Sequence, residues 1–109
     1  MLKKRYIKSR QVWKVTFELP RAELPEGVEA EMVYLVGEFN DWDPTATPMT
    51  RRKGGVFRAA LELEPGREYQ FRYLVNGERW CNDWHADAYV PTGLGEDNCV
   101  VVASEGGDV

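Results

Sequence analysis

The chain has 109 residues, which is enough for one folded domain with a single core and too few for two. Five of its fourteen basic residues lie within residues 1–10, so the net charge of −4 conceals a distinctly acidic body. An acidic body argues against nucleic acid as the main partner, because phosphate binding depends on dense Lys and Arg. No apolar run approaches the ~20 residues of a membrane span, and the start lacks the apolar core of a secretion signal. We therefore expect a cytoplasmic protein without a membrane partner.

Residues 1–10 read as a basic N-terminal arm, and a solvated terminal segment is the favoured interpretation. Contact with an anionic partner, or with the acidic body of a second copy, is the alternative. The first predicted strand follows at residues 12–19, where apolar residues alternate with mostly polar ones. Trp13 lies on the apolar face of this strand and is expected in the core.

A second strand is predicted from Val33 to Phe39, again with alternating apolar residues. It runs directly into Asn40, Asp41, Asp43 and Pro44, which are turn-forming residues. Trp42 lies among them, a large ring in a polar loop that cannot easily bury it. This arrangement suits a surface that stacks on a flat ligand.

The remaining strands are predicted at residues 56–63, 68–75, 78–80 and 98–103. Asn76-Gly77 is a strong signal for a tight hairpin, since both residues accept positive φ values. Residues 44–55 and 81–94 are expected to be irregular connections. With no helical periodicity of useful length, these short strands predict an antiparallel β-sandwich over residues 11–103, followed by a flexible tail at residues 104–109.

The residue types give little support for catalysis or metal binding. Ser9, Ser104 and the single histidine His85 do not make a convincing triad. Cys81 and Cys99 lack the usual spacing of zinc ligands, and a reduced pair is the default, although the two could lie close in space. A pair of carboxylates for glycoside hydrolysis is not excluded among the acids of residues 83–97. We expect no metal, no cofactor and no catalytic residue.

Four motifs together point to a family. They are residues 33–42, residues 69–77, Trp80 and residues 94–98, and over residues 31–103 they resemble carbohydrate-binding module family 48. This is the isoamylase N-terminal or glycogen-binding domain, found in the beta subunit of AMP-activated protein kinase and in glycogen branching and debranching enzymes. The resemblance implies an immunoglobulin-like (early set) sandwich that binds α-glucans. It also implies a non-catalytic module, because the chemistry of those enzymes resides in a separate barrel.

The resemblance also implies the carbohydrate-binding residues, which are Trp42, Arg72, Trp80, Leu94, Glu96 and Asn98. The tryptophan rings would cover apolar sugar faces, and the arginine and asparagine would bond hydroxyls. Leu94 would sit against the inside of a curved glucan. Glu96 stands where binding members have threonine, which replaces a neutral polar contact by a negative charge that a sugar does not require.

Four of these residues also have a structural interpretation. Trp80 could cover one end of the sandwich, Leu94 and Asn98 could shape the last turn, and Arg72 could pair with Glu62 or Glu78. Trp84 has no counterpart in the kinase-type modules. It either extends the aromatic platform or fills the long loop, and packing is the favoured role.

The sequence thus predicts a stand-alone module that binds α-glucan polysaccharide or maltooligosaccharide, possibly alongside a glucan-processing enzyme. The alternative is a protein-interaction module that docks on such an enzyme and binds no sugar, with Trp42, Trp80 and Trp84 as anchors. The orientation of Glu96 separates the two, because a carboxylate turned into the ring of Trp42, Trp80 and Leu94 weakens the sugar interpretation.

Overall fold

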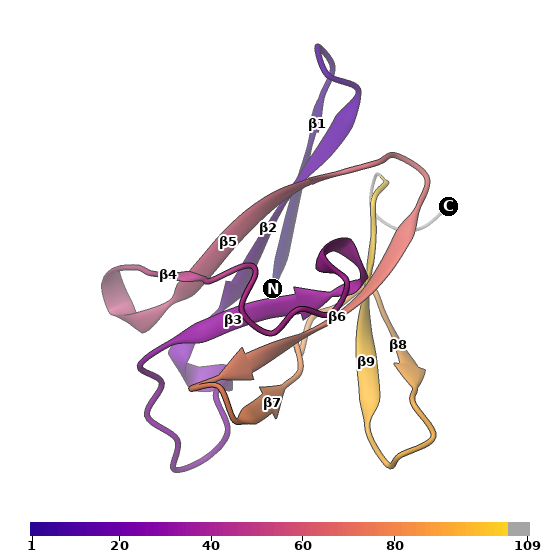
Figure 1. Cartoon of the computed structure of the whole chain (residues 1–109). Coiled ribbons are helices and arrows are strands. Elements are labelled where there is room, and N and C mark those ends of the chain that lie inside the picture. The colour runs from indigo at the N-terminus through magenta and orange to yellow at the C-terminus, as the bar shows by residue number, and fades with distance from the viewer. Residues whose placement is uncertain (105–109) are drawn as a thin grey trace.

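Two antiparallel sheets face each other in the computed structural model, which describes residues 1–104 (Figure 1). The first sheet has the strand order β1 (Leu2–Ile7), β2 (Val12–Leu19), β5 (Phe57–Leu63), β4 (Thr50–Arg51). The second has the order β3 (Val33–Gly37), β6 (Glu68–Val75), β9 (Asp97–Val102), β8 (Ala88–Pro91), and β7 (Arg79–Cys81) also pairs with β6. The predicted all-β, immunoglobulin-like sandwich is confirmed.

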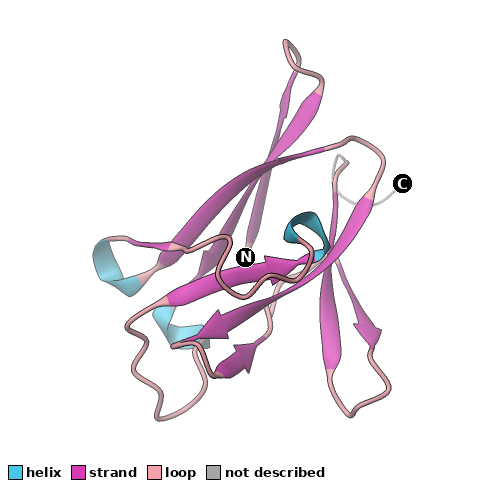
Figure 2. Ribbon diagram, in the orientation of Figure 1, coloured by secondary structure: helices cyan, strands magenta, loops and turns pink. Residues whose placement is uncertain are grey.

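The helical content is confined to three 3₁₀ turns (Figure 2). They are η1 (Arg21–Glu23), η2 (Glu38–Asn40) and η3 (Lys53–Gly55). Within residues 1–104, the structure contains no helix that is long and apolar enough to cross a membrane.

The first strand was not anticipated. Residues 1–10 were expected to be solvated, but Leu2–Ile7 forms β1 and pairs with β2 from Leu2↔Phe17 to Ile7↔Val12. A basic strand is tolerated because the inward-pointing Lys4 is neutralised, its Nζ lying 2.6 Å from Asp87 Oδ2. The β1–β2 hairpin projects beyond the body of the sandwich (Figure 1). The division at residues 10 and 103 stays a prediction, and the tail beyond Ser104 lies outside the described residues.

The core between the sheets is built from alternating residues of β2, β3, β5, β6 and β9. Its aromatic centre is formed by Phe17, Phe71 and Tyr73, with ring centroids 5.1 Å apart for the first pair and 5.7 Å for the second. These three side chains are fully buried. Trp13 packs against the same cluster, partly buried, in keeping with the role expected for it. Because one face of β6 is fixed in this core, its alternate residues must lie on the outer face.

Gly37 lets β3 approach β6 closely just before the loop that carries Trp42. Its backbone is extended, with φ of −173°, but a Cβ there would lie 2.6 Å from the carbonyl oxygen of Gln70 and 2.8 Å from Phe71 Cβ. Gly37→Ala is therefore expected to lower the free energy of unfolding by about 1–3 kcal/mol through overpacking. Urea unfolding followed by circular dichroism measures this, and a loss below about 0.5 kcal/mol would mean that the strands separate at little cost.

Candidate functional site

Arg72 is the centre of a polar and aromatic cluster on the outer face of β6. Its guanidinium carbon lies 5.7 Å from the centre of the Trp80 ring, which is 41% exposed. Trp80 reaches this face because it pairs with Leu74, two residues along β6 from Arg72. Arg72 also donates from Nε to Asn82 Oδ1 at 2.6 Å and forms an ion pair through Nη1 with Glu96. These two contacts hold the guanidinium beside the indole.

Glu96 is the partner of Arg72, in place of the Glu62 or Glu78 considered from the sequence. Its carboxylate is thus turned toward Arg72. The ring of Trp42, Trp80 and Leu94, by which the orientation of Glu96 was to be judged, does not close around it, because β3 and β7 pair with different sides of β6. Glu96 remains about half exposed, with 56% of its side chain accessible, while the Arg72 side chain is 13% exposed. The two charges balance each other at the surface, so the negative charge added by Glu96 does not stand alone.

Asn98 borders this cluster from β9. It precedes Cys99, which pairs with Phe71, and so lies beside Arg72 on the adjacent strand. Its Nδ2 donates to Gln70 Oε1 at 3.0 Å. The backbone N–H of Gln70 donates in turn to Glu38 Oε1 at 2.7 Å. The bond to Gln70 holds the Asn98 amide on the outer face. Gln70 was not among the site residues predicted from the sequence.

Trp42 lies at the opposite edge of β6, because β3 and β7 pair with different sides of that strand. The Asn40 side chain shapes the turn, with Nδ2 donating to the Leu35 carbonyl at 2.9 Å and Oδ1 accepting from the Gly37 N–H at 3.1 Å. Asp41 and Trp42 both have positive φ values, of 57° and 58°. Two successive non-glycine residues in this region are uncommon, and such backbone strain concentrates at binding sites. Trp42 is 36% exposed.

Leu94 projects from the loop between β8 and β9. The loop is closed by the Thr92 hydroxyl, which donates to the Glu96 carbonyl at 2.9 Å and accepts from the Leu94 N–H at 3.2 Å. Leu94 itself is 86% exposed, so its side chain does not stabilise the turn by packing. The structure thus joins Arg72, Trp80 and Glu96 by direct contact, places Asn98 next to them, and leaves Trp42 and Leu94 at the borders.

Asp83 is a fully buried acid, which the sequence suggested only as one of several acids that could form a carboxylate pair. Its carboxylate accepts hydrogen bonds from the Tyr73 hydroxyl and the His85 N–H, both at 2.7 Å, and contacts the nitrogen of Met1. Its backbone carbonyl accepts from the Tyr89 hydroxyl at 2.6 Å. Burial, and then the neighbouring Asp83 carboxylate, raise the pKa of Tyr73 well above its usual value. Asp83 therefore anchors the loop of residues 82–87 to the core.

The favoured packing role of Trp84 is wrong, since the side chain next to this anchor is 71% exposed. Cys81 and Cys99 are both buried and unpaired with each other. No group of three His, Cys, Asp or Glu side chains suited to a metal ion occurs in the described part of the chain.

A small β-sandwich that presents aromatic rings and a balanced ion pair on one sheet defines a binding module. The family model "Carbohydrate-binding module 48 (Isoamylase N-terminal domain)" matches residues 28–90, more than half of the chain. The chain belongs to this family, and the family prediction made from the four motifs is confirmed. As a member of that family it is a carbohydrate-binding module and non-catalytic.

Similar proteins include enzymes and a chloroplast protein. The chain is 36% identical over 47 residues to a 1,4-alpha-glucan branching enzyme of Xanthomonas campestris, covering 42% of this chain and 6% of that protein. It is 48% identical over 42 residues to the 1,4-alpha-glucan-branching enzyme of Emericella nidulans, covering 38% and 6%. It is 32% identical over 77 residues to the chloroplastic PTST homolog 2 of Arabidopsis thaliana, covering 69% and 13%.

Among solved structures, the ferric enterobactin esterase of Salmonella typhimurium matches with a TM-score of 0.54 and 17% identity, covering 84% of this chain and 23% of that one. At that identity the likeness concerns the fold alone. The chain thus spans a small part of each of these larger proteins.

Proposed function

We propose that this module binds α-glucans of the glycogen or starch type through Trp42, Arg72, Trp80, Leu94, Glu96 and Asn98. The observation that carries the proposal is the exposed Trp80 ring held beside the Arg72 guanidinium on the outer face of β6. An indole offers flat apolar area to the C–H face of a glucose ring at low entropic cost. The adjoining guanidinium supplies donors for hydroxyl oxygens.

The Arg72–Glu96 pair is compatible with a neutral ligand. Arg72 has five N–H donors, of which the contacts with Asn82 and Glu96 use two, so donors remain for a sugar. Glu96 contributes acceptors for sugar hydroxyls, and its charge is balanced by Arg72. We infer that this pair takes the place of the threonine contact in other members, with binding that depends little on salt.

Native electrophoresis in gels with and without glycogen tests the proposal. The wild type is expected to be retarded by glycogen, and Trp42→Ala is expected to relieve most of that retardation because one stacking surface is lost. Tyr6→Ala is the matched control, since Tyr6 is a similarly exposed aromatic residue (43%) on the other sheet. Equal migration of all three folded proteins in both gels would rule out glucan binding at this site.

Docking on a protein partner is the second candidate function. It is favoured by the exposure of Trp84 and Leu94, 71% and 86%, since large apolar side chains left in water often anchor interfaces. The partner we propose is a glucan-processing enzyme, and the compartment we propose is the cytoplasm, where free thiols such as Cys81 and Cys99 persist. That the module acts stand-alone stays a prediction.

A further inference from the structure

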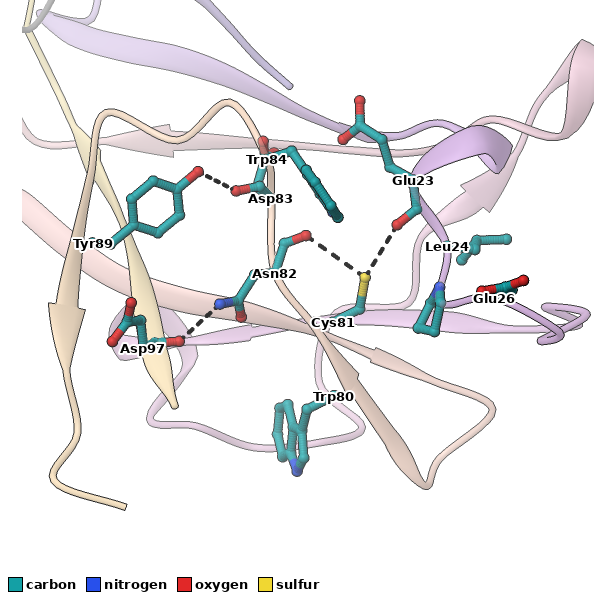
Figure 3. A pocket seen from close by; sticks show the side chains of 11 residues that line it. Glu23, Leu24, Glu26, Trp80, Cys81, Asn82, Asp83, Trp84, Tyr89 and Asp97 are labelled. Carbon is teal, nitrogen blue, oxygen red and sulfur yellow. Dashed lines mark hydrogen bonds between the residues drawn. The ribbon is translucent and has the colours of Figure 1, made fainter. Parts of the chain in front are cut away.

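A cleft of about 750 Å³ opens beside Trp80, between the β7 edge of the second sheet and the loop that follows η1. Its lining includes Leu24, Glu26, Trp80, Asn82, Trp84 and Asp97. Trp80 and Trp84 stand at opposite ends of the lining side chains, with the end of β7 between them (Figure 3). The volume falls within the range of ligand-binding clefts, about 300–1,000 Å³.

The cleft is continuous with the proposed glucan site. Trp80 belongs to both, and Asn82 lies on the boundary, accepting from Arg72 Nε at 2.6 Å and donating from Nδ2 to the Asp97 carbonyl at 3.0 Å. Asp97 itself lies between Glu96 and Asn98 in the chain. A ligand that covers the Trp80 ring therefore borders the cleft.

Trp84 is presented to solvent by a rigid support. Asp83, the residue before it, is fully buried and held through its carboxylate and its backbone carbonyl. Its N–H also donates to Cys99 Sγ at 3.1 Å. These bonds fix the backbone next to Trp84. The indole of Trp84, 71% exposed, therefore offers its face to a ligand in the cleft that it lines.

The lining chemistry suits a chain of neutral sugars. Its aromatic side chains, Trp80, Trp84 and Tyr89, provide apolar faces, and the Glu26 and Asp97 carboxylates accept hydrogen bonds from hydroxyls. None of the described residues that line the cleft is Lys or Arg, which disfavours an anionic ligand. A cationic peptide would also find acceptors here, but continuity with the sugar site at Trp80 favours the glucan.

We propose that the cleft extends the binding site for long α-glucan chains, with Trp84 as a stacking platform beyond Trp80. The inference rests on the proposed function and adds a preference for chain length. A short oligosaccharide occupies only the surface around Arg72, whereas a longer chain continues past Trp80 into the cleft and gains the contact with Trp84.

Isothermal titration with maltotriose and with maltoheptaose tests this, using wild type, Trp84→Ala, Trp84→Phe and Trp42→Ala. We expect Trp84→Ala to lower maltoheptaose affinity about five- to tenfold and to leave maltotriose affinity within about twofold, because only the longer chain reaches this ring. Trp84→Phe keeps an aromatic face and should retain most of the affinity for maltoheptaose.

The other outcomes separate the two proposals. If Trp84→Ala lowers the affinity for both sugars equally, or for neither, the chain-length inference is overturned. In that case a lower affinity of Trp42→Ala for the sugars still supports the proposed function. Absence of binding by the wild type overturns both. Binding of an oligo-arginine peptide that Trp84→Ala abolishes, with unchanged maltoheptaose affinity, would instead assign the cleft to a basic protein segment.

Discussion

Asp83→Ala is expected to lower the free energy of unfolding by about 3–5 kcal/mol, because it removes one partner from a buried polar network. Asp83 is fully buried, and the hydroxyl of the equally buried Tyr73 would lose its acceptor. The His85 N–H would lose one as well. For a domain whose whole stability is of the order of 5–15 kcal/mol, this is a large fraction. Urea unfolding at pH 7, followed by tryptophan fluorescence, measures it.

Three further variants make this result interpretable. Tyr73→Phe removes one donor and leaves the carboxylate with its other contacts, so a smaller loss of about 1–3 kcal/mol is expected. Asp87→Ala removes an acid that is one-fifth exposed and paired with Lys4, and should also cost less than Asp83→Ala. If Asp83→Ala cost no more than Asp87→Ala, Asp83 would not be the anchor of the loop. Asp83→Asn, which keeps the shape of the side chain, supplies the comparison if the alanine variant does not fold.

Trp80→Ala is expected to weaken glycogen binding at least tenfold, more than Trp42→Ala or Trp84→Ala alone. The reason is position, since Trp80 lies beside Arg72 in the proposed site and also lines the cleft. Loss of a central aromatic anchor typically costs 2 kcal/mol or more, about a 30-fold change in affinity. Affinity electrophoresis over a series of glycogen concentrations gives the dissociation constants.

Trp80→Phe is the control for this variant, because it keeps a ring that can stack on a sugar and lie beside the guanidinium. It should recover most of the binding lost in Trp80→Ala. A Trp80→Ala protein that stays folded and binds glycogen like the wild type would contradict the central place given to this residue.

The sequence predicted the strands whose two faces differ most. β2 and β6 have the predicted bounds because their apolar residues alternate without interruption and one face enters the core. The same parity placed Arg72 on the outer face, and Asn76-Gly77 adopts the positive φ values expected of a hairpin, 54° and 74°. These features depend on residues that are close to one another in the sequence, so the local pattern is enough to predict them.

Some of the features that were missed are local and others depend on distant partners. β1 pairs with β2 and β8 pairs with β9, each the next strand in the chain, but neither β1 nor β8 has the uninterrupted apolar alternation of β2 and β6. The role of Asp83 depends on Tyr73, which lies on another strand. Trp84 is exposed although the residue before it is fully buried. The contact between Asp83 and Tyr73 joins separate segments, so residues 81–94 considered alone do not indicate it.

The two buried cysteines can report local opening of the second sheet through their rates of alkylation. Burial raises the pKa of both thiols, that of Cys99 to about 11, so little reactive thiolate exists at neutral pH. Cys81 and Cys99 lie on different strands, β7 and β9, that both pair with β6. Alkylation of each thiol therefore requires that part of the sheet to open, and the two labelling rates would report separately how often each half of β6 loses its neighbour.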